Sequence, residues 1–428
     1  MSVAAGEPRK GGTVMRAMGL STVLLLLFAH TLAGRQWPQF RGPTGQGHAD
    51  AHEVPLHWSE DDNVRWKVPV EGRGWSSPVV AGGKVWLTTS VEAGGSPRNR
   101  AGISLRALAF DAASGKRVVD TEVFRLTRPR ELNPKNNLAS PTPILDGDRV
   151  YVHYGADGTA ALTSSGEVVW RAQLSYESQH GAGGSPALYR DLLIVNCDGN
   201  ASEAFVAAID TRTGKERWRR DRRRPTDQAY TTPLVINAAG RDQLVSVGAY
   251  RATSYDPLTG REIWHVGYED GFSNVPRPVF GNGLVFIATG FQQPRLIAVR
   301  PDGSGDVTRT HVAWTLTRGA PLTPSPVLVD NDLYVVSDNG ILTQVDSRTG
   351  AVRYQQRLGG GSYSASPVSA EGRLYFLSEE GVTTVISTGP AFTRLAVNRV
   401  DGATLASMAV VDGAIFLRTD RFLYRIGE

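Results

Sequence analysis

The residues that could carry out chemistry in this sequence are few and poorly spaced for catalysis. The single Cys, Cys197, excludes a disulfide framework and a zinc site built on a Cys pair. Neither a G-x-S-x-G nucleophile motif nor a Walker phosphate loop occurs. We therefore expect no catalytic residue and no metal ligand. Cys197 ends an apolar run and is expected to be a buried strand residue.

Hydrogen bonding and ring stacking are the chemistry that remains. Polar and aromatic residues recur shortly before a step in which Pro follows a small residue. Such side chains can donate hydrogen bonds to, and stack on, a planar or sugar-like ligand. The alternative is that they only satisfy backbone groups in loops. The candidate ligand-binding residues are Arg73, Trp75, Asn137, His180, Tyr230, Asn274, Arg277, Thr323 and Tyr363.

The Pro steps mark an internal repeat that must position these residues. Most of the intervals are about 45 residues, which is the length of a propeller blade. Each copy contains short runs rich in Val, Ile, Leu, Tyr and Phe between Gly or Asp turns, and such runs are typical of β-strands. A degenerate eighth copy begins near Leu405. The seven Pro residues are Pro78, Pro143, Pro186, Pro233, Pro278, Pro326 and Pro367.

Repeats that cannot bury both faces alone must stack on their neighbours, and radial stacking leaves few free edges. The sequence therefore predicts an all-β fold, an eight-bladed β-propeller of four-stranded blades. The last copy lacks a fourth strand, and residues 64–67 supply a matching one, so we expect the amino-terminal strand to complete the last blade. The propeller is then one domain, residues 64–428. A seven-bladed ring with one copy outside it is the alternative.

Residues 208–218 of the third copy read A-x-D-x-x-T-G-x-x-x-W, and the pattern recurs in part in other copies. This pattern resembles that of quinoprotein-type propellers. The resemblance implies that the Trp docks on the neighbouring blade and that Thr-Gly forms the tight turn between the last two strands. The residues expected in these structural roles are Trp66, Trp170, Asp210, Thr213, Gly214, Trp218, Asp256, Thr259, Gly260, Trp264 and Trp314.

Segments such as residues 37–43, 271–278 and 363–367 resemble a group of secreted bacterial propellers described as PQQ-like (pyrroloquinoline-quinone-like) repeat proteins. These are similar in architecture to the BamB-type scaffold of outer-membrane protein assembly. The resemblance implies an exported, non-catalytic platform for protein binding or assembly in the cell envelope, with a ligand pocket in the central funnel as a further option. We expect it to be a monomer with envelope protein partners or an unidentified small ligand.

Two other functions remain open. One is a PQQ-dependent quinoprotein dehydrogenase. Resemblance to that family would imply a quinone and a calcium ion in the funnel and a carboxylate that acts as general base. Adjacent cysteines against the ring, found in the best-known members, are absent here, and the blades are almost minimal. We therefore expect no cofactor, and PQQ with calcium only under this alternative. The second is a periplasmic protein that binds a sugar-like or anionic small ligand.

The amino terminus has the order of a secretory signal: basic residues, a short apolar run and then small residues. We interpret residues 1–33 as a signal peptide, with Met15 as the favoured start, and residues 34–63 as an amino-terminal extension. An uncleaved anchor is the alternative. The expected location is periplasmic or extracellular, with no transmembrane segment after cleavage. The net charge of +4 includes a dense arginine run at residues 217–224, expected to be a loop, and we expect no nucleic-acid partner.

Overall fold

The innermost strand of seven blades begins directly after one of the recurring Pro residues. Pro suits this place because it lacks a backbone N–H and cannot take part in the sheet that follows. The computed structural model describes residues 36–92, 102–127, 132–178, 180–199, 204–222 and 228–427. The proposed signal peptide lies outside these residues. No helix within the described ranges is long and apolar enough to cross a membrane.

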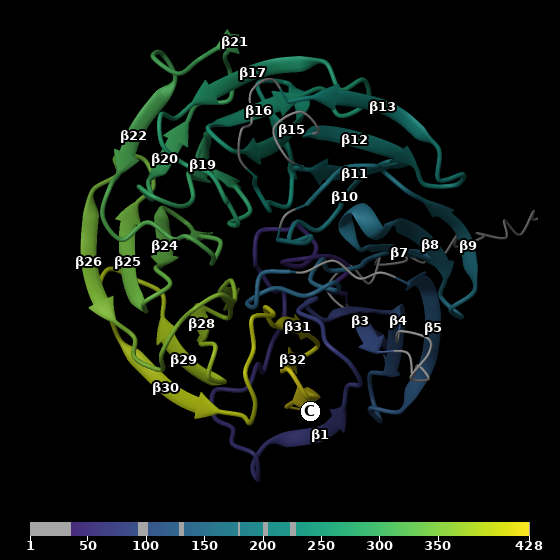
Figure 1. The fold of residues 1–428 in the computed structure, drawn as a ribbon. Helices are drawn as coiled ribbons and strands as arrows, with labels where there is room; N and C mark the ends of the chain where they lie inside the picture. Colours follow the sequence, from purple (N-terminus) through teal and green to yellow (C-terminus); the bar gives the residue numbers. More distant parts are fainter. Residues whose placement is uncertain are drawn as a thin grey trace, which may run out of the picture. The chain divides into compact units, whose positions relative to one another are not determined.

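The strands form eight antiparallel sheets in a ring, which Figure 1 shows along the chain from purple to yellow. Blade 1 contains β2 (Val79–Ala81), β3 (Lys84–Glu92), β4 (Ile103–Asp111) and β5 (Arg117–Leu126). Blade 2 contains β6 (Ile144–Asp146), β7 (Arg149–His153), a 3-10 turn η2 (Gly155–Asp157), β8 (Thr159–Thr163) and β9 (Val168–Ala172). Blade 3 contains β10 (Ala187–Tyr189), β11 (Leu192–Cys197), β12 (Phe205–Asp210) and β13 (Glu216–Asp221). Blade 4 contains β14 (Leu234–Ala238), β15 (Arg241–Gly248), β16 (Arg251–Tyr255) and β17 (Glu262–Gly267).

The second half of the ring repeats this order. Blade 5 contains β18 (Val279–Gly281), β19 (Leu284–Ala288), β20 (Leu296–Val299) and β22 (Val312–Leu316), while the short β21 (Gly305–Asp306) pairs in parallel with β17 of blade 4. Blade 6 contains β23 (Val327–Val329), β24 (Asp332–Val336), β25 (Ile341–Asp346) and β26 (Val352–Arg357). Blade 7 contains β27 (Val368–Ala370), β28 (Arg373–Leu377), β29 (Val382–Ser387) and β30 (Arg394–Arg399). Blade 8 contains β31 (Ala409–Val411), β32 (Ala414–Arg418), β33 (Phe422–Ile426) and β1 (Val64–Pro69).

The prediction of an eight-bladed ring closed by its amino-terminal strand is confirmed. β1 pairs antiparallel with β33, so that Lys67 lies opposite Tyr424 and Val68 opposite Leu423. A strand from each end of the chain thus completes one sheet. The alternative of a seven-bladed ring is excluded by this pairing.

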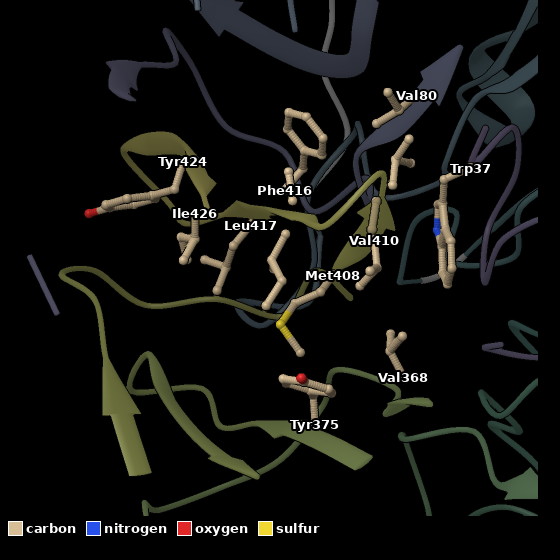
Figure 2. Close-up of a cluster of buried hydrophobic side chains, with 14 of the residues drawn as sticks. Trp37, Val80, Val368, Tyr375, Met408, Val410, Phe416, Leu417, Tyr424 and Ile426 are labelled. Atoms are coloured by element: carbon tan, nitrogen blue, oxygen red, sulfur yellow. The ribbon is translucent and has the colours of Figure 1, made fainter. Parts of the chain in front are cut away.

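The core lies between the blades because every sheet packs on two neighbours. β12 is buried at all its positions, as expected for a strand covered on both faces, whereas the outermost β13 buries only Trp218. Figure 2 shows the cluster beside blade 8, where Trp37 of the extension and Tyr375 of blade 7 surround Met408 and Val410. The arginine run expected as a loop lies on β13 as far as Asp221, and this outermost strand exposes every residue except Trp218. The end of the run, Arg223 and Arg224, lies outside the described residues.

Tryptophans seal four of the blade boundaries in one common way. Each lies on an outermost strand, stacks on a turn glycine of the next blade and donates its indole N–H to a carbonyl of that turn. Trp218 Nε1, for example, donates to Pro257 O at 3.1 Å. The pairs of tryptophan and glycine are Trp66 with Gly115, Trp170 with Gly214, Trp218 with Gly260, and Trp314 with Gly350.

Trp264 departs from this arrangement. It packs among apolar residues that include Val285 and Val299 of blade 5, but its indole N–H donates to Gln243 Oε1 of its own blade at 2.7 Å. Blade 5 carries an inserted turn and β21 where the docking tryptophans of the other seams meet a turn glycine. The tryptophan therefore lacks the usual carbonyl partner.

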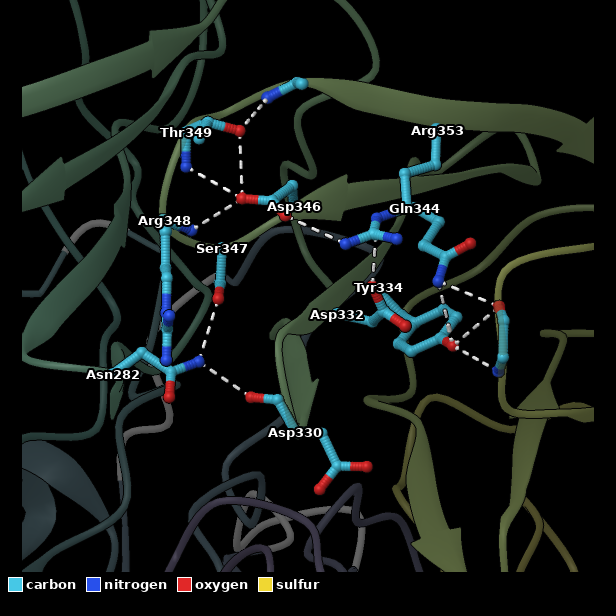
Figure 3. Close-up of polar contacts among 12 residues, drawn as sticks. Asn282, Asp330, Asp332, Tyr334, Gln344, Asp346, Ser347, Arg348, Thr349 and Arg353 are labelled. Carbon is cyan, nitrogen blue, oxygen red and sulfur yellow. Dashed lines mark hydrogen bonds and ion pairs between the residues drawn. The ribbon is translucent and has the colours of Figure 1, made fainter.

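The Asp-x-x-Thr-Gly turn has the same geometry in three blades. Figure 3 shows it in blade 6, where one oxygen of Asp346 accepts hydrogen bonds from the backbone N–H groups of Arg348 and Thr349 and from the Thr349 hydroxyl. Hydrogen bonds from Thr349 lower the pKa of Asp346. Asp210 accepts from Thr213 N–H in the same way, and Asp256 accepts from Thr259 N–H, both at 2.9 Å. The turn is thus pre-formed to receive the docking ring.

Candidate functional site

The residues that immediately precede the seven recurring Pro residues, together with Ser407 before Met408 in the eighth copy, form a ring around the central channel. Seven of these eight are Ser or Thr, the eighth is Arg277, and we call the seven the hydroxyl ring. The backbone N–H of one blade donates to the hydroxyl oxygen of the next. The pairs are Ser77 to Thr142, Thr142 to Ser185 and Ser185 to Thr232 (2.9 Å each), Arg277 to Ser325 (2.9 Å), Ser325 to Ser366 (3.0 Å), Ser366 to Ser407 (2.9 Å) and Ser407 to Ser77 (3.0 Å).

The step from Thr232 to position 277 is the only interruption in this circle of hydrogen bonds. A guanidinium carries no acceptor, so Arg277 cannot receive the N–H of Thr232 as a hydroxyl would. Arg277 instead points its side chain away along the channel. At this one position of the ring, a positively charged guanidinium replaces the hydroxyl that the other seven blades carry.

A cavity of about 480 Å³, the funnel, lies on the side of the ring from which the loops arrive. The hydroxyl ring lines it, and so does the residue two positions earlier in every blade, because alternate residues of an extended chain face the same side. We call these eight residues the rim. They are Trp75, Ser140, Gly183, Tyr230, Val275, Thr323, Ser364 and Leu405.

Longer loops add further groups to the funnel. His180 stacks obliquely on Tyr230 with ring centroids 6.2 Å apart, and Phe272 meets Phe291 edge to face at 5.6 Å. Lys135 reaches from the linker before blade 2 to Glu379 of blade 7, with Nζ 2.7 Å from Oε1. Among the described residues that line the funnel there is no Asp or Glu.

The amino-terminal extension occupies the opposite side of the hydroxyl ring. Its hydrogen bonds go to residues three positions after a ring position, within the innermost strands, about 10 Å further along the channel. The purple segment accordingly crosses the centre of the ring in Figure 1. The contacts are Trp37 with Val80 (2.8 and 2.9 Å), Pro38 O with Leu145 N (2.8 Å), Gln46 Oε1 with Phe280 N (2.6 Å), and Gly47 O with Ser369 N (2.8 Å).

The extension is therefore a plug, residues 37–49, that joins blades 1, 2, 5 and 7 across the channel. Phe40 of the plug also lines the funnel. Because the plug closes one end of the channel, the end that carries the rim is the accessible one. This asymmetry gives the ring one candidate binding face.

Four of the nine candidate ligand-binding residues line the funnel: Trp75, His180, Tyr230 and Thr323. Three are rim residues, and His180 belongs to a longer loop. Burial, together with the Asp198 charge, raises the pKa of Tyr230, whose hydroxyl donates to Gln228 at 2.5 Å. Thr323 donates to Asp338, also at 2.5 Å.

The other five candidates do not line the funnel. Asn274 and Tyr363 stand three positions before the ring, so their side chains face into the protein, where both are fully buried. Asn274 Nδ2 donates to Ala288 O at 3.3 Å, and Tyr363 Oη donates to Gly359 O at 2.7 Å. These two residues hold loops together and do not present groups to a ligand.

Arg73 and Asn137 are also displaced from the funnel. Arg73 is exposed, and its backbone pairs with Ser90. Asn137 is buried and accepts the N–H of Ala139 at 2.8 Å, which closes a local turn. The fifth residue, Arg277, is 2% exposed, and its side chain bonds backbone carbonyls in the channel beyond the hydroxyl ring.

The side chains of Arg277 and of Arg41, which belongs to the plug, lie close together in the channel. Each donates to the carbonyl of a Pro directly after a ring position and to a backbone carbonyl of the plug. The contacts of Arg277 are Phe40 O (2.8 Å) and Pro233 O (2.9 Å), and those of Arg41 are Gln46 O (2.9 Å) and Pro326 O (2.5 Å). Burial lowers the pKa of Arg277 to about 9. Burial and the neighbouring Arg277 charge lower that of Arg41 to about 9.

A buried ion pair stands behind the funnel in blade 3. Asp198 Oδ1 lies 3.1 Å from Arg222 Nη1, and both side chains are buried. Burial raises the pKa of Asp198 to about 6, although the Arg222 charge lowers it. Asp198 lines a separate small cavity with His153 and does not line the funnel.

The family to which this ring belongs is decided by sequence comparison. A family model described as "Outer membrane protein assembly factor BamB" matches residues 104–356 and 303–421, well over half of the chain. The chain belongs to this family. No curated protein matches the sequence.

Solved structures show the same fold at low identity. BamB from Moraxella catarrhalis is 13% identical and covers 85% of this chain and 97% of its own, with a TM-score of 0.57. A europium-containing methanol dehydrogenase is 12% identical over 83% of this chain and 89% of its own, with a TM-score of 0.52. The computationally designed Ika8 protein is 11% identical over 84% and 98%, with a TM-score of 0.57. The BamB family thus shares its architecture with an enzyme and with a designed ring.

The quinone and calcium of the enzyme alternative do not fit this funnel. Such a site needs carboxylate oxygens to bind the metal and a carboxylate general base beside the quinone ring. The described lining offers hydroxyls, amides, aromatics and Lys135. Within the described ranges, no three His, Cys, Asp or Glu residues are grouped to hold a metal ion. Asp198 is held by Arg222 outside the funnel.

The sequence does carry a signal for the funnel lining. The Ser or Thr that recurs before Pro places its hydroxyl in the cavity. Counting back three residues from each of the seven Pro residues selects seven of the eight rim residues, all except Leu405 of the eighth copy. Lys135, on the linker before blade 2, and Phe291, in the loop between β19 and β20, carry no such signal, because neither stands at a position shared by the copies.

Proposed function

We propose that this chain is a non-catalytic binding platform in the cell envelope whose funnel receives a segment of a partner protein. One observation carries the proposal: the plug closes one side of the channel while the rim side presents a cavity lined by aromatic, amide and hydroxyl groups. A rigid propeller with one accessible face favours the binding of a partner over catalysis. Family membership supports the envelope location and protein partners.

Site-specific photo-cross-linking in the native host tests the platform. A benzophenone amino acid at Phe291, which lines the funnel and is 54% exposed, is compared with one at Val397 on the outermost strand of blade 7, which is 55% exposed. We expect discrete protein adducts at Phe291 that are absent at Val397. Equal adduct patterns at the two sites, or none at Phe291, would refute docking at the funnel.

A small-ligand binding protein is the second candidate. The funnel volume falls in the range of ligand pockets, and the pairs His180 with Tyr230 and Phe272 with Phe291 offer faces for stacking. Native mass spectrometry of protein purified from its host would detect a retained ligand. Stoichiometric quinone and calcium with dye-linked dehydrogenase activity would overturn both non-catalytic proposals.

A further inference from the structure

The hydroxyl ring presents donors to the funnel. Each of its seven oxygens already accepts a backbone N–H from the neighbouring blade. A Ser or Thr hydroxyl then still carries one proton, which rotates to suit an acceptor. Within the described part of the chain these hydroxyls have no hydrogen-bond acceptor, and all seven line the funnel floor. The floor therefore offers O–H donors, while each hydroxyl oxygen already accepts one hydrogen bond from a backbone N–H.

Two positive charges lie directly beyond this floor. Arg41 and Arg277 are each 2% exposed and bond only backbone carbonyls within the described structure, so neither has a carboxylate partner there. Nε and Nη1 of Arg41 and Nε of Arg277 are buried without a hydrogen-bond partner. Burying a charge without a counter-charge is costly, and two adjacent ones add repulsion. The pKa values of both guanidiniums are lowered, which agrees with this environment.

The described funnel lining contains no carboxylate, and its one lysine, Lys135, is paired with Glu379, which lies outside the lining. The lining therefore brings no unpaired carboxylate to offset the two guanidiniums beyond the floor. Hydroxyl donors in front of fixed guanidiniums are the features that recognise oxyanions. The unusual residue is Arg277, because the repeat offers a hydroxyl at its seven equivalent positions and a hydroxyl would need no counter-ion.

We propose that the funnel floor binds an oxyanion group, a carboxylate or a phosphate, through the hydroxyl ring and in the positive field of Arg41 and Arg277. The group belongs to the ligand or partner that enters from the rim. This inference rests on the proposed function in taking the funnel as the binding face. It adds the charge and chemical class of what reaches the bottom of the funnel.

Anion-dependent stability tests the site with the whole protein. The midpoint of thermal unfolding is measured in inorganic phosphate, acetate or chloride at constant ionic strength and pH. Arg277→Thr places at position 277 the residue type that its equivalents carry, so we expect it to fold. Arg353→Gln removes one positive charge on the outermost strand β26, away from the funnel, and is the matched control.

We expect phosphate or acetate to raise the midpoint of the natural protein and of Arg353→Gln above its value in chloride. Isothermal titration should show binding weakened about tenfold or more in Arg277→Thr. Arg41→Gln, which keeps an amide donor, should show the same loss and serves if the first variant fails to fold. An equal response in all variants, or no difference among the anions, would overturn the site.

The source of the oxyanion is separated by competition. A short peptide with a free terminal carboxylate is compared with its amide against bound phosphate. Displacement by the acid alone identifies a partner's carboxyl terminus, whereas binding of phosphate without displacement identifies a free small anion, and both support the site. Cross-links at Phe291 with no anion response would overturn the oxyanion site while leaving the platform proposal intact.

Discussion

Gly260 is the residue at which the seam between blades 3 and 4 is most open to a quantitative test. Its φ is +68°, and a Cβ there would lie 2.5 Å from Cε3 of the docked Trp218 ring. Gly260→Ala therefore carries two costs. A left-handed backbone with a Cβ costs about 1–2 kcal/mol. Displacing the ring costs a further ~1–3 kcal/mol in overpacking, which includes weakening the hydrogen bond to Pro257 O.

Gly240 provides a matched control in the same blade. Its φ is +73°, and no atom lies within 4 Å of the position that a Cβ would take. Gly240→Ala therefore carries only the backbone cost of about 1–2 kcal/mol. We expect the free energy of unfolding to fall by about 2 kcal/mol more for Gly260→Ala than for Gly240→Ala.

Urea denaturation followed by circular dichroism gives these free energies. A double-mutant cycle with Trp218→Ala then shows whether the excess cost passes through the ring, because the methyl group added at position 260 has nothing to displace once the indole is gone. Equal losses for the two glycine variants would refute the view that the tryptophan stack seals the seam. So would an excess that persists in the Trp218→Ala background.

Three further predictions concern single side chains. Burial lowers the pKa of His153 to about 4 from 6.5, so stability is lost as pH falls from about 6.5 to 4, and His153→Gln should show about 3 kcal/mol less loss over that window by urea denaturation at each pH. Cys197 is fully buried and its thiol pKa is raised by burial, so a thiol reagent should label it only as fast as the protein unfolds. Glu371 accepts the N–H groups of Glu53 and Val54 at 2.7 and 2.9 Å, and Glu371→Ala should speed proteolysis near Val54 without loss of the ring's circular dichroism.

Each of these predictions has a contrary outcome. An unchanged pH profile in His153→Gln would place the acid sensitivity elsewhere. Labelling of Cys197 in the folded protein would mean that blade 3 opens locally. Unaltered proteolysis in Glu371→Ala would mean that the other contacts of the extension hold it without this carboxylate.

The blade count and the ring closure were predictable because they depend on signals along the chain. The Pro step, the turn glycines and the alternating strands recur locally in each copy. The missing strand of the last copy and the matching strand at residues 64–67 can likewise be recognised from the sequence alone. Sequence could also predict docking at Trp218, since its turn partner follows in the next copy.

The tertiary structure alone decided what lines the funnel and what lies beneath it. Asn274 and Tyr363 are of residue types that suit a binding site, yet they stand one position out of phase with the rim and face inward. Ser407 bonds Ser77 across 330 residues, and Arg41 comes to lie near Arg277 only because the plug crosses the channel. Side-chain type is a local property, whereas the direction a loop residue faces depends on strand phase and on which distant segments share the channel.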